Sequence, residues 1–280
     1  MQTTSIANAN ANANAPRPPK PRSPGIPLDE ASIPRHWFAG NVWATQVANG
    51  VNLLFPAGER FFVRSVNHFA KDLDPALAAQ VRGFFGQEGR HAKEHERFFE
   101  VMEAQGYDIA RFLRVYEAIA YGFIERVASP NLRLATTAAC EHFTAILAEH
   151  ALRKRVLDHA APPVRSLLLW HAAEEIEHRS VAFDVLKSVA PSYPLRLAGL
   201  AMASLCLGGF WIAATTTLLA QEPGLGLSRL RKDARQARAN LGDDSVFRRG
   251  IREYMRRDFH PSQSDTDRLA ADYLESVGLT

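Results

Sequence analysis

Cysteine is scarce in this sequence of 280 residues, and neither sign of charge is in large excess. The two cysteines, Cys140 and Cys206, both lie in apolar stretches. This excludes a disulfide framework and a cysteine-rich metal site, and it suits a reducing compartment. The formal net charge is +3, and the positive charge is concentrated after residue 225. A general role in nucleic-acid binding is therefore not expected.

The N-terminal region lacks the long apolar run of a secretory signal, so export is not expected. Residues 8–15 alternate asparagine with alanine, and residues 16–27 are rich in proline. This composition predicts a disordered arm over residues 1–35. The hydrophobic content of the whole chain, 46%, permits a large core. We expect a helical bundle over 36–192, an apolar segment over 193–222 and a basic helical tail over 223–280.

Residues 164–190 contain neither glycine nor proline and are rich in alanine, leucine and glutamate, so they are predicted to be helical. On a helix, His171, Glu175 and His178 are spaced i, i+4 and i+7 and share one face. Two imidazoles and a carboxylate among apolar neighbours are costly to bury without a partner. A metal ion is the natural partner for these three side chains.

Three other segments supply complementary groups. Glu88 and His91 form a second Glu-x-x-His, and Glu59 and Glu141 each stand alone in an apolar segment. The expected helices cover residues 46–70, 74–104 and 129–159, with a crossover helix over 108–127. One Glu from each of two helices and a Glu-x-x-His from each of the other two is the ligand pattern of ferritin-like di-metal bundles. We therefore predict an all-α, ferritin-like antiparallel four-helix bundle.

The predicted metal ligands are Glu59, Glu88, His91, Glu141, His171, Glu175 and His178. The four glutamates among them are also the predicted catalytic residues. For His95, one turn after His91, three alternatives are open: a metal ligand, a partner of the ligands or a solvated residue. The substrate is expected to lie against Phe62, Phe84 and Ala145.

These segments resemble a known family. The stretches are Phe-Pro-Ala-Gly-Glu-Arg-Phe-Phe at 55–62, Gln-Glu-Gly-Arg-His at 87–91 and His-x-x-x-Glu-x-x-His at 171–178. They resemble the bacterial family described as predicted metal-dependent hydrolases, which are ferritin-like di-metal carboxylate proteins. His171, one turn before Glu175, is similar to the third histidine ligand of the p-aminobenzoate N-oxygenase group. The resemblance covers about residues 41–190 and implies a metal site.

The predicted ligands suit two iron ions, with manganese or zinc as alternatives. The apolar residues around them favour an oxygen-dependent oxidase or oxygenase that acts on an apolar or amphiphilic small molecule. The chain has no Gly-x-Gly-x-x-Gly segment and no cysteine cluster, so the electrons would come from a separate reductase or ferredoxin. A binuclear metal-dependent hydrolase is the first alternative. A non-catalytic iron-binding protein is the second.

Residues 197–220 carry no charge over 24 positions, which is long enough for a membrane helix. A spanning helix, a hairpin that turns at Gly208 and Gly209, and a fifth helix buried on the bundle are the three alternatives. A basic cluster follows and suits anionic headgroups at a cytoplasmic surface. It comprises Arg229, Arg231, Lys232, Arg235 and Arg238. We therefore expect a cytoplasmic protein in contact with the inner face of the cytoplasmic membrane.

Overall fold

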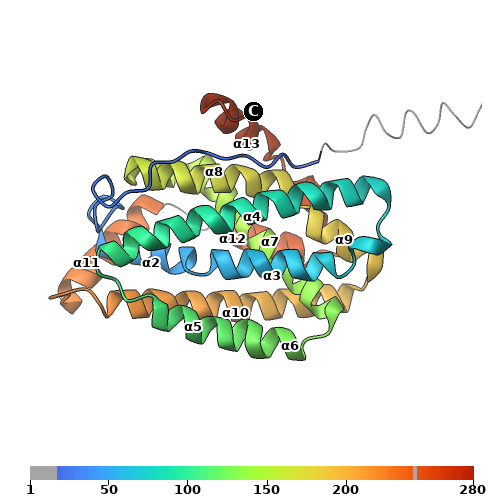
Figure 1. The fold of residues 1–280 in the computed structure, drawn as a ribbon, viewed down its shortest axis with the longest axis horizontal. Coiled ribbons are helices and arrows are strands. Elements are labelled where there is room, and N and C mark those ends of the chain that lie inside the picture. Colours follow the sequence, from blue (N-terminus) through green and yellow to red (C-terminus); the bar gives the residue numbers. More distant parts are fainter. Residues whose placement is uncertain (1–17, 242–244) are drawn as a thin grey trace, which may run out of the picture.

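The computed structural model describes residues 18–241 and 245–280. Regular structure in these residues is helical, apart from one isolated bridge between Phe38 and Ala160, and the helices pack as a bundle (Figure 1). The predicted all-α bundle is confirmed. Its central helices are α2 (Val42–Asn52), α3 (Phe55–Asn67), α4 (Pro75–Ala104), α7 (Pro130–Lys154), α8 (Pro162–His178) and α9 (Val181–Val189).

The other helices lie around this centre (Figure 1). The crossover comprises α5 (Ala110–Ile119), a π-helical turn (Ala120–Ile124) and α6 (Glu125–Val127). The C-terminal part comprises α10 (Tyr193–Leu219), α11 (Leu227–Leu241), α12 (Ser245–Tyr254) and α13 (Asp267–Ser276). Short 3-10 turns cover Ala70–Asp72, Val156–His159 and Pro261–Gln263.

Two of the expected helix starts are confirmed in detail. The Asp74 carboxylate accepts hydrogen bonds from the first-turn amides of α4, and Pro75 occupies the first helical position. At α7, the Ser129 hydroxyl accepts a hydrogen bond from the amide of Leu132. Both caps satisfy amides that have no partner within the helix, so these helices begin at the predicted residues.

Three expected helices differ in extent from the structure. The helix predicted over 46–70 is α2 and α3, which break at Leu53 because Pro56 has no amide to donate into the preceding turn. The helix predicted over 164–190 is α8 and α9. The Arg179 guanidinium, between them, donates to the carbonyl of Ile176 and caps the end of α8. The helix predicted over 129–159 ends at Lys154, where the next residue adopts a left-handed conformation (φ 53°).

The arm predicted to be disordered over 1–35 is ordered from residue 18 onward, and residues 1–17 lie outside the described residues. The segment follows α4 and α8 along the top of the bundle in Figure 1. It fits closely because a Cβ at Gly83 would stand 2.2 Å from the carbonyl oxygen of Pro19. Arg22 also forms ion pairs with Glu174 and Glu177 of α8. Proline-rich composition alone did not reveal these partners.

Helix α10 is continuous through both central glycines, so the hairpin alternative is wrong. It packs on α7 so closely that a Cβ at Gly199 would stand 2.4 Å from the carbonyl oxygen of Ala135. On α2, a Cβ at Gly50 would meet the Thr215 hydroxyl of α10 at the same distance. Among the described residues, α10 is the one helix long and apolar enough to cross a membrane.

The hydrophobic core has two parts with polar side chains between them. One part contains Trp170 and Phe98, and the other contains Phe84 and Leu134. The ring of His91 stands edge-on to Trp170 at 4.9 Å, and the ring of His178 stands edge-on to Phe84 at 5.1 Å. The predicted metal ligands therefore lie in the interior of the bundle, enclosed by apolar side chains.

His142 is a buried histidine at the contact between α7 and α12. Its Nε2 hydrogen bonds to the carbonyl of Gly250 at 2.8 Å, and burial lowers its pKa to about 4. A lowered pKa in the folded state contributes stability that is present above pH 6.5 and is lost as the pH falls towards 4. The loss is about 3 kcal/mol. We expect the free energy of unfolding of His142→Gln, measured by urea titration, to fall less steeply than that of the wild type as the pH is lowered from 6.5 to 4. Parallel curves for wild type and variant would contradict this.

Candidate metal centre

The seven predicted ligands converge from four helices. Helix α3 supplies Glu59, α4 supplies Glu88 and His91, α7 supplies Glu141, and α8 supplies His171, Glu175 and His178. Each has at most 4% of its surface exposed. The structure therefore brings together every residue that the sequence pattern selected, and none of them points to solvent.

His178 lies where three carboxylates from three helices meet. Its Nε2 is 3.1 Å from Glu88 Oε1, 3.4 Å from Glu141 Oε2 and 3.4 Å from Glu175 Oε1. The other ring nitrogen, Nδ1, lies 2.9 Å from the amide oxygen of Gln87, which fixes the orientation of the ring. With Nδ1 donating to Gln87, Nε2 is directed at the three carboxylates.

The second half of the centre lies around His171 and His91, whose rings stack with centroids 4.2 Å apart. His171 Nε2 is 2.8 Å from Glu175 Oε1 and 3.8 Å from Glu59 Oε1. His91 Nδ1 is 3.6 Å from the same oxygen of Glu175. Glu175 therefore lies between the two halves and borders histidines of both.

Buried polar atoms without partners indicate that this cluster suits metal ions. Within the described residues, both carboxylate oxygens of Glu59, Glu88 and Glu141 are buried and have no hydrogen-bond partner. The same holds for one oxygen of Glu175, for Nδ1 of His91 and for Nε2 of His178. Native proteins leave few such atoms unpaired. Carboxylate oxygens and imidazole nitrogens are the donors that divalent iron, manganese and zinc bind.

Four overlapping sets of three residues have ligand atoms within 4.8 Å of one another. They are Glu59–His95–His171, His91–His171–Glu175, Glu59–Glu88–His91 and Glu88–Glu175–His178. Each of these side chains is buried, and each set contains donors of both kinds. The arrangement can hold metal ions at more than one position.

Burial and mutual repulsion disfavour the ionised form of most of these carboxylates when no cation is present. Burial raises the pKa of Glu59 well above its usual value, and the charges of Glu88 and Glu175 raise it further. Burial also raises the pKa of Glu141 well above that value, although His178 opposes the change. Metal binding must therefore displace protons from these groups.

Glu175 and His178 are the exceptions. Burial raises the pKa of Glu175, but His178 and His171 outweigh it and hold the pKa well below the usual range. Burial lowers the pKa of His178, but Glu175 and Glu141 outweigh it and raise the pKa well above the usual value. Each of these two side chains, whose nearest atoms are 3.4 Å apart, therefore favours the charged form of the other.

His95 lies inside the cluster, where no solvent reaches it. It is fully buried, its Nε2 is 2.5 Å from His171 Nδ1, and its other nitrogen hydrogen bonds to the side chain of Asn52. The spacing of four residues after His91 was the available signal. The structure rules out the solvated alternative, and His95 joins Glu59 and His171 in one of the candidate ligand sets.

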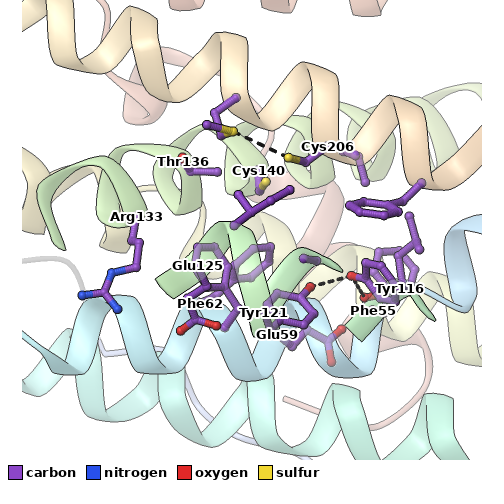
Figure 2. A pocket seen from close by; sticks show the side chains of 18 of the residues that line it. Phe55, Glu59, Phe62, Tyr116, Tyr121, Glu125, Arg133, Thr136, Cys140 and Cys206 are labelled. Atoms are coloured by element: carbon purple, nitrogen blue, oxygen red, sulfur yellow. Dashed lines mark hydrogen bonds between the residues drawn. The ribbon is translucent and has the colours of Figure 1, made fainter. Parts of the chain in front are cut away.

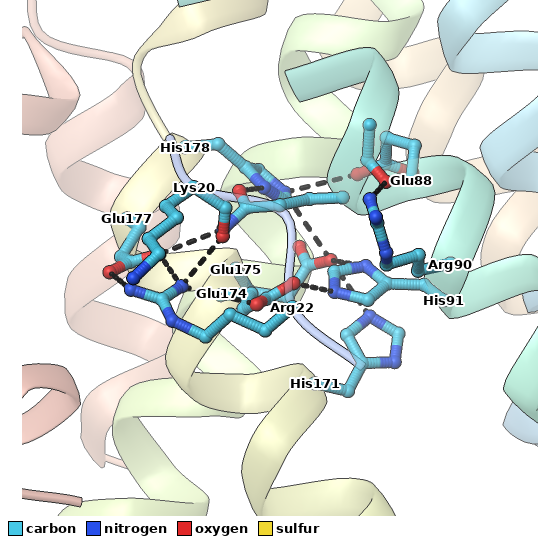
Figure 3. A network of polar contacts seen from close by, with 12 residues as sticks. Lys20, Arg22, Glu88, Arg90, His91, His171, Glu174, Glu175, Glu177 and His178 are labelled. Atoms are coloured by element: carbon cyan, nitrogen blue, oxygen red, sulfur yellow. Dashed lines mark hydrogen bonds and ion pairs between the residues drawn. The ribbon is translucent and has the colours of Figure 1, made fainter. Parts of the chain in front are cut away.

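A network outside the ligands was not found from the sequence (Figure 3). Glu174 Oε2 lies 3.1 Å from His91 Nε2, and Glu174 Oε1 lies 3.1 Å from the Arg22 guanidinium. Arg22 also contacts Glu177 at 2.6 Å. Arg22 and Glu174 are 152 residues apart in sequence, so no local pattern joins them. The network fixes the ring of His91 from the side opposite the cluster.

We expect Glu174→Gln to weaken metal binding 10- to 100-fold, the usual effect of removing a group that orients a ligand. The control is Glu96→Gln, which alters an exposed glutamate that pairs with Arg60 on the surface. Competition with a chelating indicator measures the affinity. An affinity in Glu174→Gln equal to that in Glu96→Gln would show that Glu174 does not orient a ligand.

Two cavities adjoin the cluster on either side of Phe55. The larger, about 800 Å³, lies among α2, α7, α8 and α11 and reaches His171 and Glu175. The smaller, about 100 Å³, lies among α3, α7, the crossover and α10 and reaches Glu59 (Figure 2). Both have mainly apolar walls. A small molecule can therefore approach the centre from an apolar environment.

The expected substrate contacts need correction. Phe62 lines the smaller cavity, as expected. Phe84 is fully buried against His178 and lines neither cavity, because its side of α4 faces the core. Ala145 faces away from the centre and lines a separate cavity with His142. Phe55 and Thr144, which were not selected, line both cavities beside the centre.

A family model described as "predicted metal-dependent hydrolase" matches residues 20–265. The chain belongs to this family. The matched region contains the whole cluster and also α10 and α11, so the family extends beyond the four ligand-bearing helices. No curated protein and no solved structure matches the chain. The family description supports the hydrolase alternative better than the oxidase that the sequence pattern favoured.

Proposed function

We propose that this protein is a hydrolase whose buried centre holds two divalent metal ions. One observation carries the metal centre: seven buried carboxylate oxygens and two imidazole nitrogens of the cluster have no partner among the described residues. Hydrolysis is supported by the family description. The ligands would be Glu59, Glu88, His91, Glu141, His171, Glu175 and His178. Glu175 would connect the two ions because it adjoins histidines of both halves.

The ions, when bound, would lower the pKa of water and polarise an oxygen of the substrate. The chain provides the surroundings for that chemistry. His171 and Glu175 are the cluster residues that border the larger cavity, so they would face the reacting group. Trp43, Val47 and Leu147 form part of its apolar wall and would exclude bulk water.

The substrate class follows from the walls of the larger cavity. Its volume of about 800 Å³ suits a drug-sized molecule, and its lining is mostly apolar. The exposed guanidinium of Arg238 lies at its edge, where it would attract a negative group. We therefore propose an apolar or amphiphilic substrate whose hydrolysable bond lies at the inner end.

A second candidate is oxygen-dependent oxidation at a di-iron centre. It is favoured by the ferritin-like order of the ligands and by the third histidine, His171, which is similar to that of the p-aminobenzoate N-oxygenase group. His171 lies within 4 Å of two carboxylates. In this case the protein would require electrons from a separate reductase or ferredoxin.

One experiment separates these candidates. Zinc-, manganese- and iron-loaded protein is assayed under nitrogen with ester and phosphoester substrates, and oxygen uptake by the reduced iron form is followed in parallel. We expect hydrolysis without oxygen, lost in Glu175→Ala and kept in Glu96→Ala, which alters an exposed residue. Oxygen uptake without hydrolysis would favour the oxidase. Metal uptake without either reaction would favour a binding protein.

A further inference from the structure

Two helical segments expose large apolar side chains on one side of the molecule. The crossover exposes Val115, Ile119, Phe123 and Val127 by 45–69%, and α10 exposes Leu205 by 75% and Ile212 by 70%. We call these six residues the apolar face. They are six of the ten large apolar side chains that stand exposed in the described chain. Such a concentration marks an interaction surface and not scattered surface residues.

The two segments of the apolar face lie side by side along the bottom of the bundle (Figure 1). The Tyr116 ring of α5 stands edge-on to Phe210 of α10 at 4.9 Å, which joins them on their inner side. On the outer side, Val115, Ile119 and Phe123 recur every four residues. The outer side of α10 carries no charge between residues 197 and 220. A solvated helix would carry charged residues there.

The charges next to this face suit a membrane surface. Helix α11 follows α10 after a short connection, and it has five basic residues that are all exposed. They are Arg229, Arg231, Lys232, Arg235 and Arg238. An apolar surface beside a basic helix is complementary to acyl chains beside anionic headgroups.

Helix α10 is covered on one side, so lipid cannot surround it. Gly199 holds it against α7, and the Trp211 indole donates a hydrogen bond to the carbonyl of Val47 in α2. However, only 22% of the most apolar 18-residue stretch of α10 is buried. A helix half packed on the bundle and half exposed suits insertion into one leaflet. It suits neither a span nor a core helix.

The smaller cavity lies between the two segments that carry this face and Glu59 of the metal centre. Its walls include Met202, Cys206 and Phe210 of α10 and Tyr121 of the π-helical turn, and Glu59 lies on its inner side (Figure 2). A π-helical turn widens a helix locally and is frequent at functional sites. Here it borders the space between the crossover and α10.

We propose that the apolar face binds the inner leaflet of the cytoplasmic membrane and that the smaller cavity admits the end of an acyl chain towards Glu59. The membrane contact stands independently of the proposed hydrolysis. The smaller cavity is thereby a second binding site, beside the larger cavity in which the substrate of the proposed hydrolysis would lie.

Vesicle sedimentation tests the membrane contact. Wild type should pellet with vesicles that contain phosphatidylglycerol, and more weakly with phosphatidylcholine alone. Phe123→Asp combined with Leu205→Asp should weaken binding at least tenfold. Val277→Asp, which alters an exposed residue at the end of α13 on the opposite side of the bundle, should not. Circular dichroism and metal binding confirm that the variants are folded.

Two results would overturn the membrane contact. The first is a wild-type protein that stays in the supernatant with both kinds of vesicle. The second is a wild-type dimer, measured by light scattering, that the double variant converts to a monomer while neither protein binds vesicles. That outcome would assign the apolar face to a second copy of this chain.

The acyl-chain path is tested with cis-parinarate, a fatty acid that fluoresces in apolar surroundings. We expect saturable binding that Ala120→Trp, in the smaller cavity, weakens at least tenfold. Ala48→Trp, in the larger cavity, should leave it unchanged. Loss in Ala48→Trp alone would place the chain in the larger cavity and overturn the path. This readout is independent of turnover, so a failed hydrolase assay does not affect it.

Discussion

Loading with zinc or manganese is expected to raise the melting temperature of this protein by about 15–30 °C. Ions that bind only the folded chain at a thousandfold excess over Kd stabilise it by about 4 kcal/mol each. Two ions would therefore contribute about 8 kcal/mol, and each kcal/mol shifts the melting temperature by about 2–4 °C at this chain length. The unpaired oxygens of Glu59, Glu88 and Glu141 are the structural reason. Differential scanning calorimetry with and without chelator measures the shift.

The control for this prediction is a pair of glutamates on α4. Glu88 belongs to two of the four candidate ligand sets, so Glu88→Ala should abolish most of the rise. Glu96 is exposed and pairs with Arg60 on the surface, so Glu96→Ala should keep it. If the melting temperature of the wild type did not respond to metal, this result would contradict the proposed metal centre. An equal response in Glu88→Ala would place the ions elsewhere.

The convergence of the ligands could be predicted from the sequence because it depends on local geometry. The helical period places His171, Glu175 and His178 on one face whatever surrounds them. Once four such helices exist, the cost of exposing apolar residues and of burying lone carboxylates brings these faces together. The same argument could not fix where each helix ends. The break before Pro56 and the cap by Arg179 depend on one missing amide and on one side-chain conformation, neither of which the spacing of apolar residues contains.

The parts of the site that the sequence did not reveal depend on distant partners. The Arg22 segment was expected to be disordered because its composition is proline-rich. Its anchors, Gly83 and Glu174, lie on helices far along the chain. The cavities also depend on the packing of several helices, which explains why Phe55 was missed and Ala145 was wrongly chosen as a substrate contact. Spacing within one helix carries no information about such neighbours.

The cluster that enables the protein to bind metal also lowers the stability of the metal-free form. Bringing Glu59, Glu88 and Glu141 into one apolar interior costs free energy until cations arrive, because burial and the neighbouring carboxylates oppose their ionisation. Groups arranged for function commonly reduce stability in this way. A substitution that removes one charge should therefore have opposite effects on the metal-free and the metal-loaded protein.

Glu59→Gln is expected to stabilise the metal-free protein and to weaken the metal-loaded one. Burial and the neighbouring carboxylates raise the pKa of Glu59 well above its usual value of 4.5. A raised pKa in the folded state gives stability that is fully present below pH 4.5 and is lost as the pH rises towards the folded-state pKa. The loss is about 1.4 kcal/mol per pH unit. Glutamine does not titrate, so the variant avoids this loss.

The advantage of Glu59→Gln should therefore be near zero at pH 4.5 and grow as the pH rises above it, measured by urea unfolding in chelator. With saturating zinc the order should reverse, because glutamine cannot supply a carboxylate to the ion. Glu96→Gln, on the surface, should follow the wild type in both conditions. A variant less stable than the wild type without metal at every pH would show that Glu59 is a structural residue and not a ligand held ready for a cation.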